Sequence, residues 1–519
     1  MYVKREFVFS LYLCRRNVNQ LHFFCMKRII VSAAIAALVT VSSFAGGLMT
    51  NTNYHIAFDR MFARGATTEI DAVFSNPAGL AWGHEGWQLS LNFQKPWQNR
   101  DVEININNFL ANPAVGNPGE TFHKKYNGEA SAPIVPALFA SYKKDRWAVS
   151  AMIGIVGSGG FVEYDEGVPM FNVPITAKIY STLFQTIAAT PYAAQADALA
   201  RDFILDSSMK GKQYIYGGQV NFTYRIIDCL SAAVGFRTNY YDGYYKGHVT
   251  AMPGQNIAAM VGNNPLMDLQ LDCVQRGWGF TPIISADFHM NKWTVAMRYE
   301  FRTKINTEND TRTLTVGTTG TNGYSVTDVK AMAEQYGNAA VITALSAPDK
   351  LGDMAGKVAD YLPNEKVRYD MPSLFVAAVG YEFTPNLRAA TEFHFFDDKN
   401  AKMGGQRQEK LSHGTYEVLA GVEWDINKKF TVSCGGQRTD YGLTDDYQQN
   451  TSFACDSWSL GLGGAWNINE KIRLNASYFC SLYSDYNKTL NNAYSTPYTV
   501  DKTYSRTNHV IGVGVDYKF

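Results

Sequence analysis

The sequence predicts an all-β membrane protein, a 14-stranded antiparallel outer-membrane β-barrel with an N-terminal hatch plugging the lumen. Three observations predict this fold. The last strand alternates strictly and ends on Phe519, short polar turns alternate with long connections, and a segment typical of a signal peptide stands near the N-terminus. Together they divide the chain into an upstream extension and signal peptide at 1–45, a hatch at 46–86 and a transmembrane β-barrel at 87–519.

The N-terminal segment predicts export. Met26 is followed by Lys-Arg, a positive n-region, and then by an apolar run at 29–41. Small residues at Ser43 and Ala45 suit a cleavage site, so the mature chain is expected to begin directly after Ala45. Because a signal peptide begins at its n-region, we expect Met26 to be the true start. The predicted location is the outer membrane of a Gram-negative bacterium.

The composition fits one large exported β protein. Aromatic residues make up 13% of the 519 residues, and 43 are glycine. The length exceeds an ordinary single-core domain, yet no linker-like change of composition divides the chain, and one large barrel accounts for both facts. With 47 Lys and Arg against 47 Asp and Glu, neither nucleic acid nor a strongly acidic partner is expected. Beyond the signal segment, no apolar run is long enough for a membrane-spanning helix.

Two kinds of connection alternate along the chain. Short polar turns between aromatic or aliphatic strand ends occur within 142–147, 224–230, 288–293, 381–387, 424–430 and 466–472. Long connections are expected at 94–132, 161–211, 250–267, 306–366, 398–413, 439–455 and 484–506. Six short and seven long connections join 14 strands, with the long ones extracellular and both termini in the periplasm.

The predicted strands have one apolar face for outer-membrane lipid and one polar face for the lumen. Odd-numbered residues from Trp293 to Phe301 are apolar and alternate with residues such as Arg298. The strand at 509–519 alternates in the same way. Aromatic residues at the short turns would form a girdle at the level of the lipid headgroups. The terminal Phe519 is the expected contact with the outer-membrane assembly machinery.

The segment 46–86 does not alternate like a strand. It is polar and rich in turns, and at its centre stands the motif Asn76, Pro77, Ala78 and Gly79, in which Pro fixes φ and Gly permits a positive φ. Apolar residues before and after the motif suit packing inside a barrel. These features favour a plug over a disordered periplasmic tail.

The patterns of glycine, histidine and cysteine indicate no enzyme activity. The pairs Gly461-x-Gly463 and Gly512-x-Gly514 lie inside strands, so they predict room for the plug and not a dinucleotide site. The nine histidines show no metal-binding spacing, and neither a metal nor another cofactor is expected. Cysteines predict no disulfide framework, although Cys434 and Cys455, which flank one loop, could pair.

The stretch 63–80, which contains Asn76-Pro-Ala-Gly79, resembles the hatch signature of the FadL-like outer membrane transport proteins. The resemblance continues in 371–374 and in the glycine-containing strands around Gly421 and Gly461, and covers nearly the whole mature chain. It implies a 14-stranded barrel with an N-terminal plug that passively carries long-chain fatty acids or related hydrophobic compounds. It also implies release of the substrate sideways into the bilayer, through an opening made by a kink in the third strand.

The third predicted strand contains residues suited to such a kink. From Trp147 it runs into Gly157, Ser158, Gly159 and Gly160, and glycines of this kind interrupt a hydrogen-bonded ladder. An ordinary exit from strand to loop is the alternative, because these residues also lie near the extracellular end.

Arg298 and Arg302 are the candidates for binding a ligand carboxylate. Both are expected to point inward, where a guanidinium beside apolar walls forms a strong charge-assisted bond. Glu300 lies between them on the same face and is the alternative partner of both. The resemblance favours hydrophobic small molecules, with fatty acids first among them. A receptor for haem or another amphiphile, a small-solute porin and a surface adhesin remain the alternatives.

Overall fold

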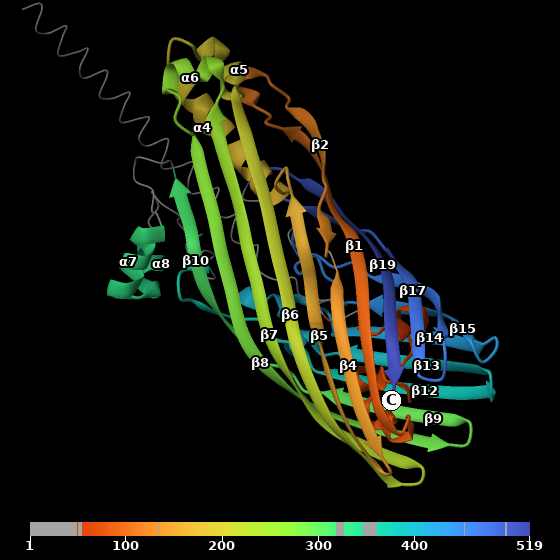
Figure 1. The fold of residues 1–519 in the computed structure, drawn as a ribbon. Helices are drawn as coiled ribbons and strands as arrows, with labels where there is room; N and C mark the ends of the chain where they lie inside the picture. The colour runs from red at the N-terminus through yellow and green to blue at the C-terminus, as the bar shows by residue number, and fades with distance from the viewer. Residues whose placement is uncertain are drawn as a thin grey trace, which may run out of the picture.

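In the computed structural model, the structure is described for residues 49, 54–132, 134–317, 326–345, 361–450, 452–493 and 496–519. The predicted signal peptide and its cleavage site lie outside these residues. The described strands form one antiparallel sheet that closes on itself, because the first strand pairs with the last from Gln88 opposite Lys518 to Ile106 opposite Val500. Figure 1 shows the tilted barrel that results. The predicted 14-stranded antiparallel outer-membrane barrel is confirmed.

Nineteen strand segments build the barrel. They are β1 (Gly86–Phe109), β2 (Glu120–Tyr126), β3 (Glu129–Ser131), β4 (Val135–Lys144), β5 (Trp147–Tyr164), β6 (Phe203–Ile227), β7 (Leu230–Pro253), β8 (Met267–Met290), β9 (Trp293–Glu300), β10 (Asn306–Gly317), β11 (Lys366–Arg368), β12 (Leu374–Thr384), β13 (Leu387–Phe396), β14 (Thr415–Asp425), β15 (Phe430–Asp440), β16 (Ser457–Asn467), β17 (Ile472–Tyr483), β18 (Tyr486–Leu490) and β19 (Val500–Lys518). Four of the 14 strands are interrupted: the second consists of β2 to β4, the seventh of β9 and β10, the eighth of β11 and β12, and the thirteenth of β17 and β18.

All six predicted short turns are present at one end of the barrel. The seven longer connections lie at the other end, as Figure 1 shows. These connections contain η3 (Pro113–Val115), α4 (Pro169–Ala188), η4 (Ala193–Gln195), α5 (Ala196–Ala200), α6 (Gln255–Val261), α7 (Val326–Tyr336), α8 (Asn338–Leu345), η7 (Asp398–Asn400) and η8 (Gly404–Lys410). None of the described helices is both long and apolar enough to cross a membrane.

Three of the predicted long connections are clearly wrong in extent, and one of them, predicted at 306–366, contains the whole of β10. The first, predicted at 94–132, is mostly strand, since β1 continues to Phe109 and β2 begins at Glu120. The last, predicted at 484–506, contains β18 and the first residues of β19. These segments were expected to be loops because they lie between the recognised short turns. The structure shows that the strands continue beyond the apolar surface band, where the lipid-facing pattern ends but the ladder does not.

Apolar side chains cover the outer surface of the barrel near the short turns. On β8, Phe280 is 64% exposed and Ile284 is 47% exposed, whereas the alternate residues Thr281 and Ser285 are buried. Because the outside of this region faces hydrocarbon, exposed apolar residues are the stable arrangement. We call this region the membrane half.

Aromatic rings gather at the short turns, as predicted. The ring centroids of Trp293 and Tyr381 are 4.5 Å apart, and those of Trp87 and Tyr142 are 5.0 Å apart. Such pairs at the end of the apolar band form the expected girdle.

Nearer the long connections, the polarity of the two faces is reversed. On the same strand β8, Leu269 and Leu271 point inward and are buried, while Gln270 is exposed. These leucines join a large apolar cluster that includes Val102, Tyr245 and many residues of α4. We call the region around this cluster the outer half. Its strands behave like those of a soluble protein, because water replaces lipid on their outer side.

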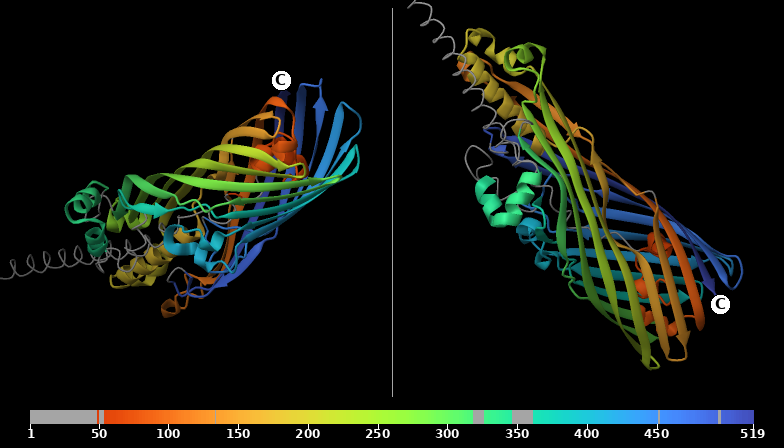
Figure 2. Two further views of the ribbon diagram at one scale, coloured as in Figure 1. Left: turned by 90° about the horizontal axis from the view of Figure 1, so that it is seen from below. Right: turned by 60° about the vertical axis from the view of Figure 1, so that its left-hand side comes forward.

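The N-terminal segment lies inside the membrane half. Figure 2 shows it enclosed by the strands. It consists of α2 (Ile56–Met61), α3 (Ala72–Ser75) and η2 (Pro77–Trp82), and nearly all of its residues are buried. We call residues 54–82 the plug segment. The predicted boundaries of the hatch stay predictions, since much of 46–53 lies outside the described residues.

Candidate functional site

Helix α2 fits against glycines on the inner wall. A Cβ atom added to Gly421 or Gly435 would lie 2.0 Å from the carbonyl oxygen of Met61. One added to Gly461 would lie 2.3 Å from the carbonyl oxygen of Asp59. Larger residues would therefore push the helix off the wall. The prediction that strand glycines make room for this segment is confirmed.

Ion pairs hold the plug segment to strands β14 and β17. Arg60 pairs with Glu423, and both side chains are fully buried. Arg60 also donates to Ser433 Oγ at 2.7 Å. Glu69 pairs with Arg473 at 2.5 Å. The Glu69 side chain is 35% exposed, so the fully buried Arg60–Glu423 pair fixes the position of the segment more strongly than the Glu69–Arg473 pair does.

The second acid of this network, Glu69, lies between two guanidiniums. Arg64 contacts it at 2.8 Å from within the plug segment, opposite Arg473. Burial alone would raise the pKa of Glu69, but Arg473 and Arg64 lower this pKa well below its ordinary value. Glu69 is therefore ionised throughout the neutral range.

The hatch motif is bound to the opposite side of the lumen, by β6, β7 and β8. Asn76 donates to Asp287 at 3.2 Å, and the backbone amide of Ala78 donates to Ser285 at 3.1 Å. Thr223 donates to the carbonyl oxygen of Pro77 at 2.8 Å. Gly79 is required by a close approach, since a Cβ there would lie 2.3 Å from the carbonyl oxygen of Thr67. The motif therefore docks the plug segment on the wall.

The two predicted carboxylate-binding arginines are not brought together. Arg298 is buried, donates to the carbonyl oxygen of Phe74 and lies 3.4 Å from Glu300. Arg302 is exposed and donates to the carbonyl oxygen of Asn400 at 2.7 Å. The expected inward orientation of Arg302 is wrong, because β9 ends at Glu300 and the alternation of the strand ends with it. Carboxylate binding by this pair stays a prediction.

Other charged residues of the lumen contact the plug segment or one another. Glu392 accepts a hydrogen bond from the backbone amide of Gly65 at 2.7 Å. His394 lies between Glu392 at 2.6 Å and Glu417 at 2.8 Å. Among the described residues, no three His, Cys, Asp or Glu side chains are placed to hold a metal ion.

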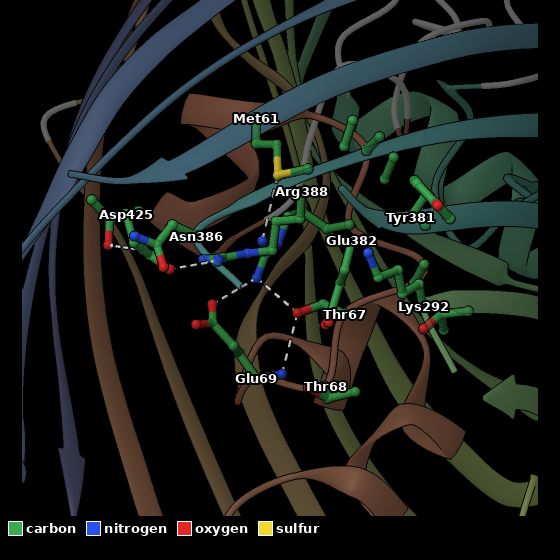
Figure 3. A pocket seen from close by; sticks show the side chains of 18 of the residues that line it. Met61, Thr67, Thr68, Glu69, Lys292, Tyr381, Glu382, Asn386, Arg388 and Asp425 are labelled. Carbon is green, nitrogen blue, oxygen red and sulfur yellow. Dashed lines mark hydrogen bonds and ion pairs between the residues drawn. The ribbon is translucent and has the colours of Figure 1, made fainter. Parts of the chain in front are cut away.

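A polar cavity of about 750 Å³ separates part of the plug segment from the wall at the short-turn end. Figure 3 shows Glu69 and Thr67 of the plug segment facing Arg388, Asn386 and Lys292 of the barrel across this cavity. Its residues include those of three short turns. The cavity is polar and lies on the side expected to face the periplasm, so it offers water, and not an apolar molecule, a place beside the plug segment.

The predicted kink residues lie where the ladder of the third strand is irregular. On the β6 side, the register of β5 shifts between Ile155 and Gly157 and again between Ser158 and Gly160. On the other side, β5 pairs with β4 as far as Ile153 and pairs again, with β3, from Phe161. No pair joins the intervening residues 154–160 to the described part of the second strand, which leaves out residue 133. We call residues 154–160, which pair with β6 but not with the second strand, the wall gap.

A second cavity, of about 120 Å³, connects the lumen to the wall gap. Ile155, Ser158 and Gly160 line it at the gap. Tyr214, the register partner of Ser158, lines it on the outward face of β6. On the luminal side it is lined by polar and aromatic residues from several strands, namely Gln94, Gln98, Arg100, Tyr441, Phe479, Tyr483, Arg506 and Asn508. We call this cavity the gap cavity.

All five cysteines of the described chain are free. Cys434 is exposed on β15, whereas Cys455 is buried and its thiol contacts the carbonyl oxygen of Tyr504 at 3.5 Å. The alternative that Cys434 and Cys455 pair is therefore wrong. One faces outward from the strand and the other faces the core of the outer half.

Several residues of the site were not predicted. Asp287 and Glu423 lie at luminal positions of membrane strands. The sequence around them does not show that these two acids, and not others, would contact the plug segment. Arg100 was assigned to a loop. Its signal is the run from Val102 to Ile106, in which every second residue is apolar and buried on the inner face.

Comparisons with known proteins agree with this architecture. Residues 337–519 match the outer membrane protein beta-barrel domain family. The chain resembles the crystal structure of a Pseudomonas aeruginosa FadL homologue, with 12% identity, a TM-score of 0.59 and coverage of 91% of this chain and 100% of that chain. It also resembles the P. putida toluene transporter TodX, with 12% identity, a TM-score of 0.51 and coverage of 92% and 99%. No curated protein matches the sequence.

At these identities the likeness shows the fold. The resemblance to FadL-like proteins that the hatch motif indicated is thus confirmed at the level of fold. An outer-membrane β-barrel of this kind indicates a location in the outer membrane of a Gram-negative bacterium.

Proposed function

We propose that the protein is a passive channel for hydrophobic small molecules, with long-chain fatty acids as the first candidates, and that it releases them sideways into the outer membrane. The wall gap carries the proposal, because it lies at the end of a cavity that begins in the lumen. The FadL homologue and the toluene transporter with the same fold support the class of substrate.

The route begins in the outer half. Its interior is apolar, and an apolar molecule that leaves water for such surroundings gains about 25 cal/mol for each Å² of surface buried. The gap cavity then leads to β5 at the level where the barrel wall changes from outer half to membrane half. In this proposal the lipid lies outside the part of the wall gap at Ile155, whose register partner Tyr216 is exposed, and it accepts an apolar molecule without further cost. Diffusion down a gradient is then sufficient.

Passage straight through the barrel is less favourable than lateral exit. The plug segment fills the membrane half and is held by the Arg60–Glu423 and Glu69–Arg473 pairs. To displace it, both pairs must break, and the buried Arg60–Glu423 pair alone costs about 3–5 kcal/mol. Lateral exit through the wall gap breaks neither. The plug segment also separates this protein from a general porin, which has an open aqueous lumen.

A bulky side chain in the wall gap tests the proposal. Ser158→Trp places an indole in the gap cavity, while Ser505→Trp puts the same group on β19, outside the lining of that cavity. We expect Ser158→Trp to lower the rate of palmitate uptake by cells about tenfold or more, and Ser505→Trp to leave it within about twofold. Both proteins should show the heat-dependent gel mobility of folded barrels. Equal uptake by the two folded variants would rule out the wall gap as the exit.

A further inference from the structure

Basic side chains gather on the outer surface directly beyond the membrane strands β9 and β13. Arg302 and Lys304 follow the last residue of β9, and Lys399 and Lys402 belong to the connection between β13 and β14. All four are exposed. Arg302 donates to the carbonyl oxygen of Asn400 at 2.7 Å, so the two segments are in contact. We call these four basic residues the basic patch.

Backbone contacts at Asp370 bring the two segments together a second time. The backbone amide of Asp370 donates to the carbonyl oxygen of Lys402 at 2.8 Å. The backbone amide of Ile305, the residue after Lys304, donates to the carboxylate of Asp370 at 3.2 Å. Lys304 and Lys402 therefore stand on either side of one residue. The chain neighbours of both lysines are buried whereas the lysines are exposed, so both side chains point away from the barrel interior.

The acids around the basic patch are bound elsewhere. Asp370 is buried, and Arg368 contacts both of its carboxylate oxygens. Asp397 is half-buried and accepts hydrogen bonds from an amide of its own turn. Glu308, an exposed acid farther along the chain from β9, stands opposite Lys366 in the ladder. No ion pair joins the basic patch to a carboxylate of the described residues, so the patch has a surplus of positive charge.

A row of aromatic rings lies next to the basic patch on the outer surface. Tyr299, Phe375 and Phe395 are register partners on β9, β12 and β13, each one residue from the strand end opposite the short turns. Phe301 is 42% exposed, precedes Arg302 in the chain and has its ring centroid 4.9 Å from that of Tyr299. Aromatic rings at the end of an apolar band lie at the level of the lipid headgroups. The basic patch is therefore at the headgroups of the leaflet on the side of the long connections.

We propose that the basic patch binds the phosphate groups of lipopolysaccharide, the glycolipid of the outer leaflet, and that the acyl chains of this lipid lie against the aromatic row. The long connections of such a barrel are extracellular, so this lipid surrounds the barrel at the patch. The planar guanidinium of Arg302 matches two phosphate oxygens, and the lysines add positive charge beside it. Basic residues at a membrane surface attract anionic lipid in this way. This surface lies outside the barrel and is separate from the proposed route of the hydrophobic substrate.

Binding of matched phosphorylated and dephosphorylated lipid tests this assignment. The patch variant combines Arg302→Gln, Lys304→Gln and Lys402→Gln. The control variant loses three exposed lysines of short turns at the opposite end of the barrel and combines Lys428→Gln, Lys429→Gln and Lys471→Gln. Both variants and the full-length parent are purified in neutral detergent, checked for the heat-dependent gel mobility of folded barrels, and titrated with lipopolysaccharide before and after enzymatic removal of its phosphates.

The parent should bind the phosphorylated lipid about tenfold or more tightly than the dephosphorylated lipid. The patch variant should bind the phosphorylated lipid about tenfold to hundredfold more weakly than the parent, and the dephosphorylated lipid within about twofold. The control variant should stay within about twofold for both lipids. A rise from about 0.1 M to about 0.5 M NaCl should weaken binding to the parent and not to the patch variant. Arg302→Lys, which keeps the charge, should retain most of the affinity.

Equal affinity of the parent for the two lipids would overturn the proposal. So would an equal loss of both lipids in the patch variant, which would make these residues structural. If inorganic phosphate at about 10 mM displaces the lipid, the site is one for free phosphate, and if phosphatidylglycerol binds as tightly as lipopolysaccharide, the surface selects no outer-leaflet lipid. Either result ends the assignment. Palmitate uptake by cells should be the same for the patch variant and the parent, so failure of this proposal leaves the proposed channel function intact.

Discussion

The membrane half and the outer half of the barrel are built from the same strands with opposite faces apolar. Strand β8 shows both arrangements, since Ile284 is exposed on its outside and Leu269 is buried on its inside. The backbone ladder is continuous between them. The backbone hydrogen bonds are therefore the same in both halves. Only the pattern of apolar and polar side chains changes where the surroundings change from lipid to water.

The two halves also differ in what fills them. Apolar side chains and helix α4 fill the outer half, whereas charged and amide side chains that bind the plug segment line the membrane half. A polar interior without a plug would hold water and conduct ions, as in a porin. Here the plug segment takes up part of that polar interior. Arg100 and Arg506 lie where one interior gives way to the other.

Loss of one plug-to-wall ion pair should have the largest effect. Arg60→Met removes two charge-assisted hydrogen bonds of the plug segment, to Glu423 and to Ser433, and we expect the docking of the segment to weaken by about 3–5 kcal/mol, although Arg388 and Arg64 still contact Glu423. Frequent openings should then appear in planar-bilayer conductance recordings. Arg407→Met removes a buried arginine of the outer half, which contacts Ser452 and Tyr447, and should leave the pore closed. A closed pore in Arg60→Met would show that the ion pair does not hold the segment.

The second-largest effect is expected from a charge placed on the outer surface, which should lower the free energy of unfolding in the membrane half but not in the outer half. Ile284→Lys places an ammonium group in hydrocarbon and should destabilise the barrel by about 2–4 kcal/mol, while Gln270→Lys, on the same face of the same strand, should change stability by less than about 0.5 kcal/mol. Urea unfolding in lipid vesicles measures both. Equal losses in the two variants would mean that the bilayer extends over the outer half.

Acid should have the smallest effect on the closed state. Arg473 and Arg64 hold the pKa of Glu69 well below its ordinary value. The contribution of ionised Glu69 to docking of the plug segment is therefore fully present above the pKa that Glu69 has in the unfolded chain. It is lost only as the pH falls through the lower pKa of the folded protein. Conductance should stay low from pH 7.5 to pH 5 and rise only at more acidic pH. Glu69→Gln should raise the basal conductance at pH 7.5 and flatten this acid response. A parent pore that already opens at pH 6 would contradict the assignment.

Much of the fold follows from local pattern. Each short turn is a few polar residues between strand ends, and each membrane strand alternates lipid-facing and luminal residues, so the number and direction of the strands could be counted along the chain. The motif around Asn76 was recognisable because proline and glycine restrict the backbone in a characteristic way. What failed was the length of the strands. The strands at 94–132 and 484–506 extend beyond the apolar band, where the alternation of lipid-facing residues no longer marks them as strands.

The sequence by itself thus determined the barrel, the plug segment and the irregular third strand, because alternation, turns and glycines act within a few residues. Only the tertiary structure decided which charges meet. Arg60 and Glu423 are 363 positions apart, and Arg100 faces Arg506 only because the first strand closes on the last in one register. Closure of a barrel fixes every cross-lumen pair at once, and a shift of one residue would turn each side chain to the other face. No local pattern contains that information.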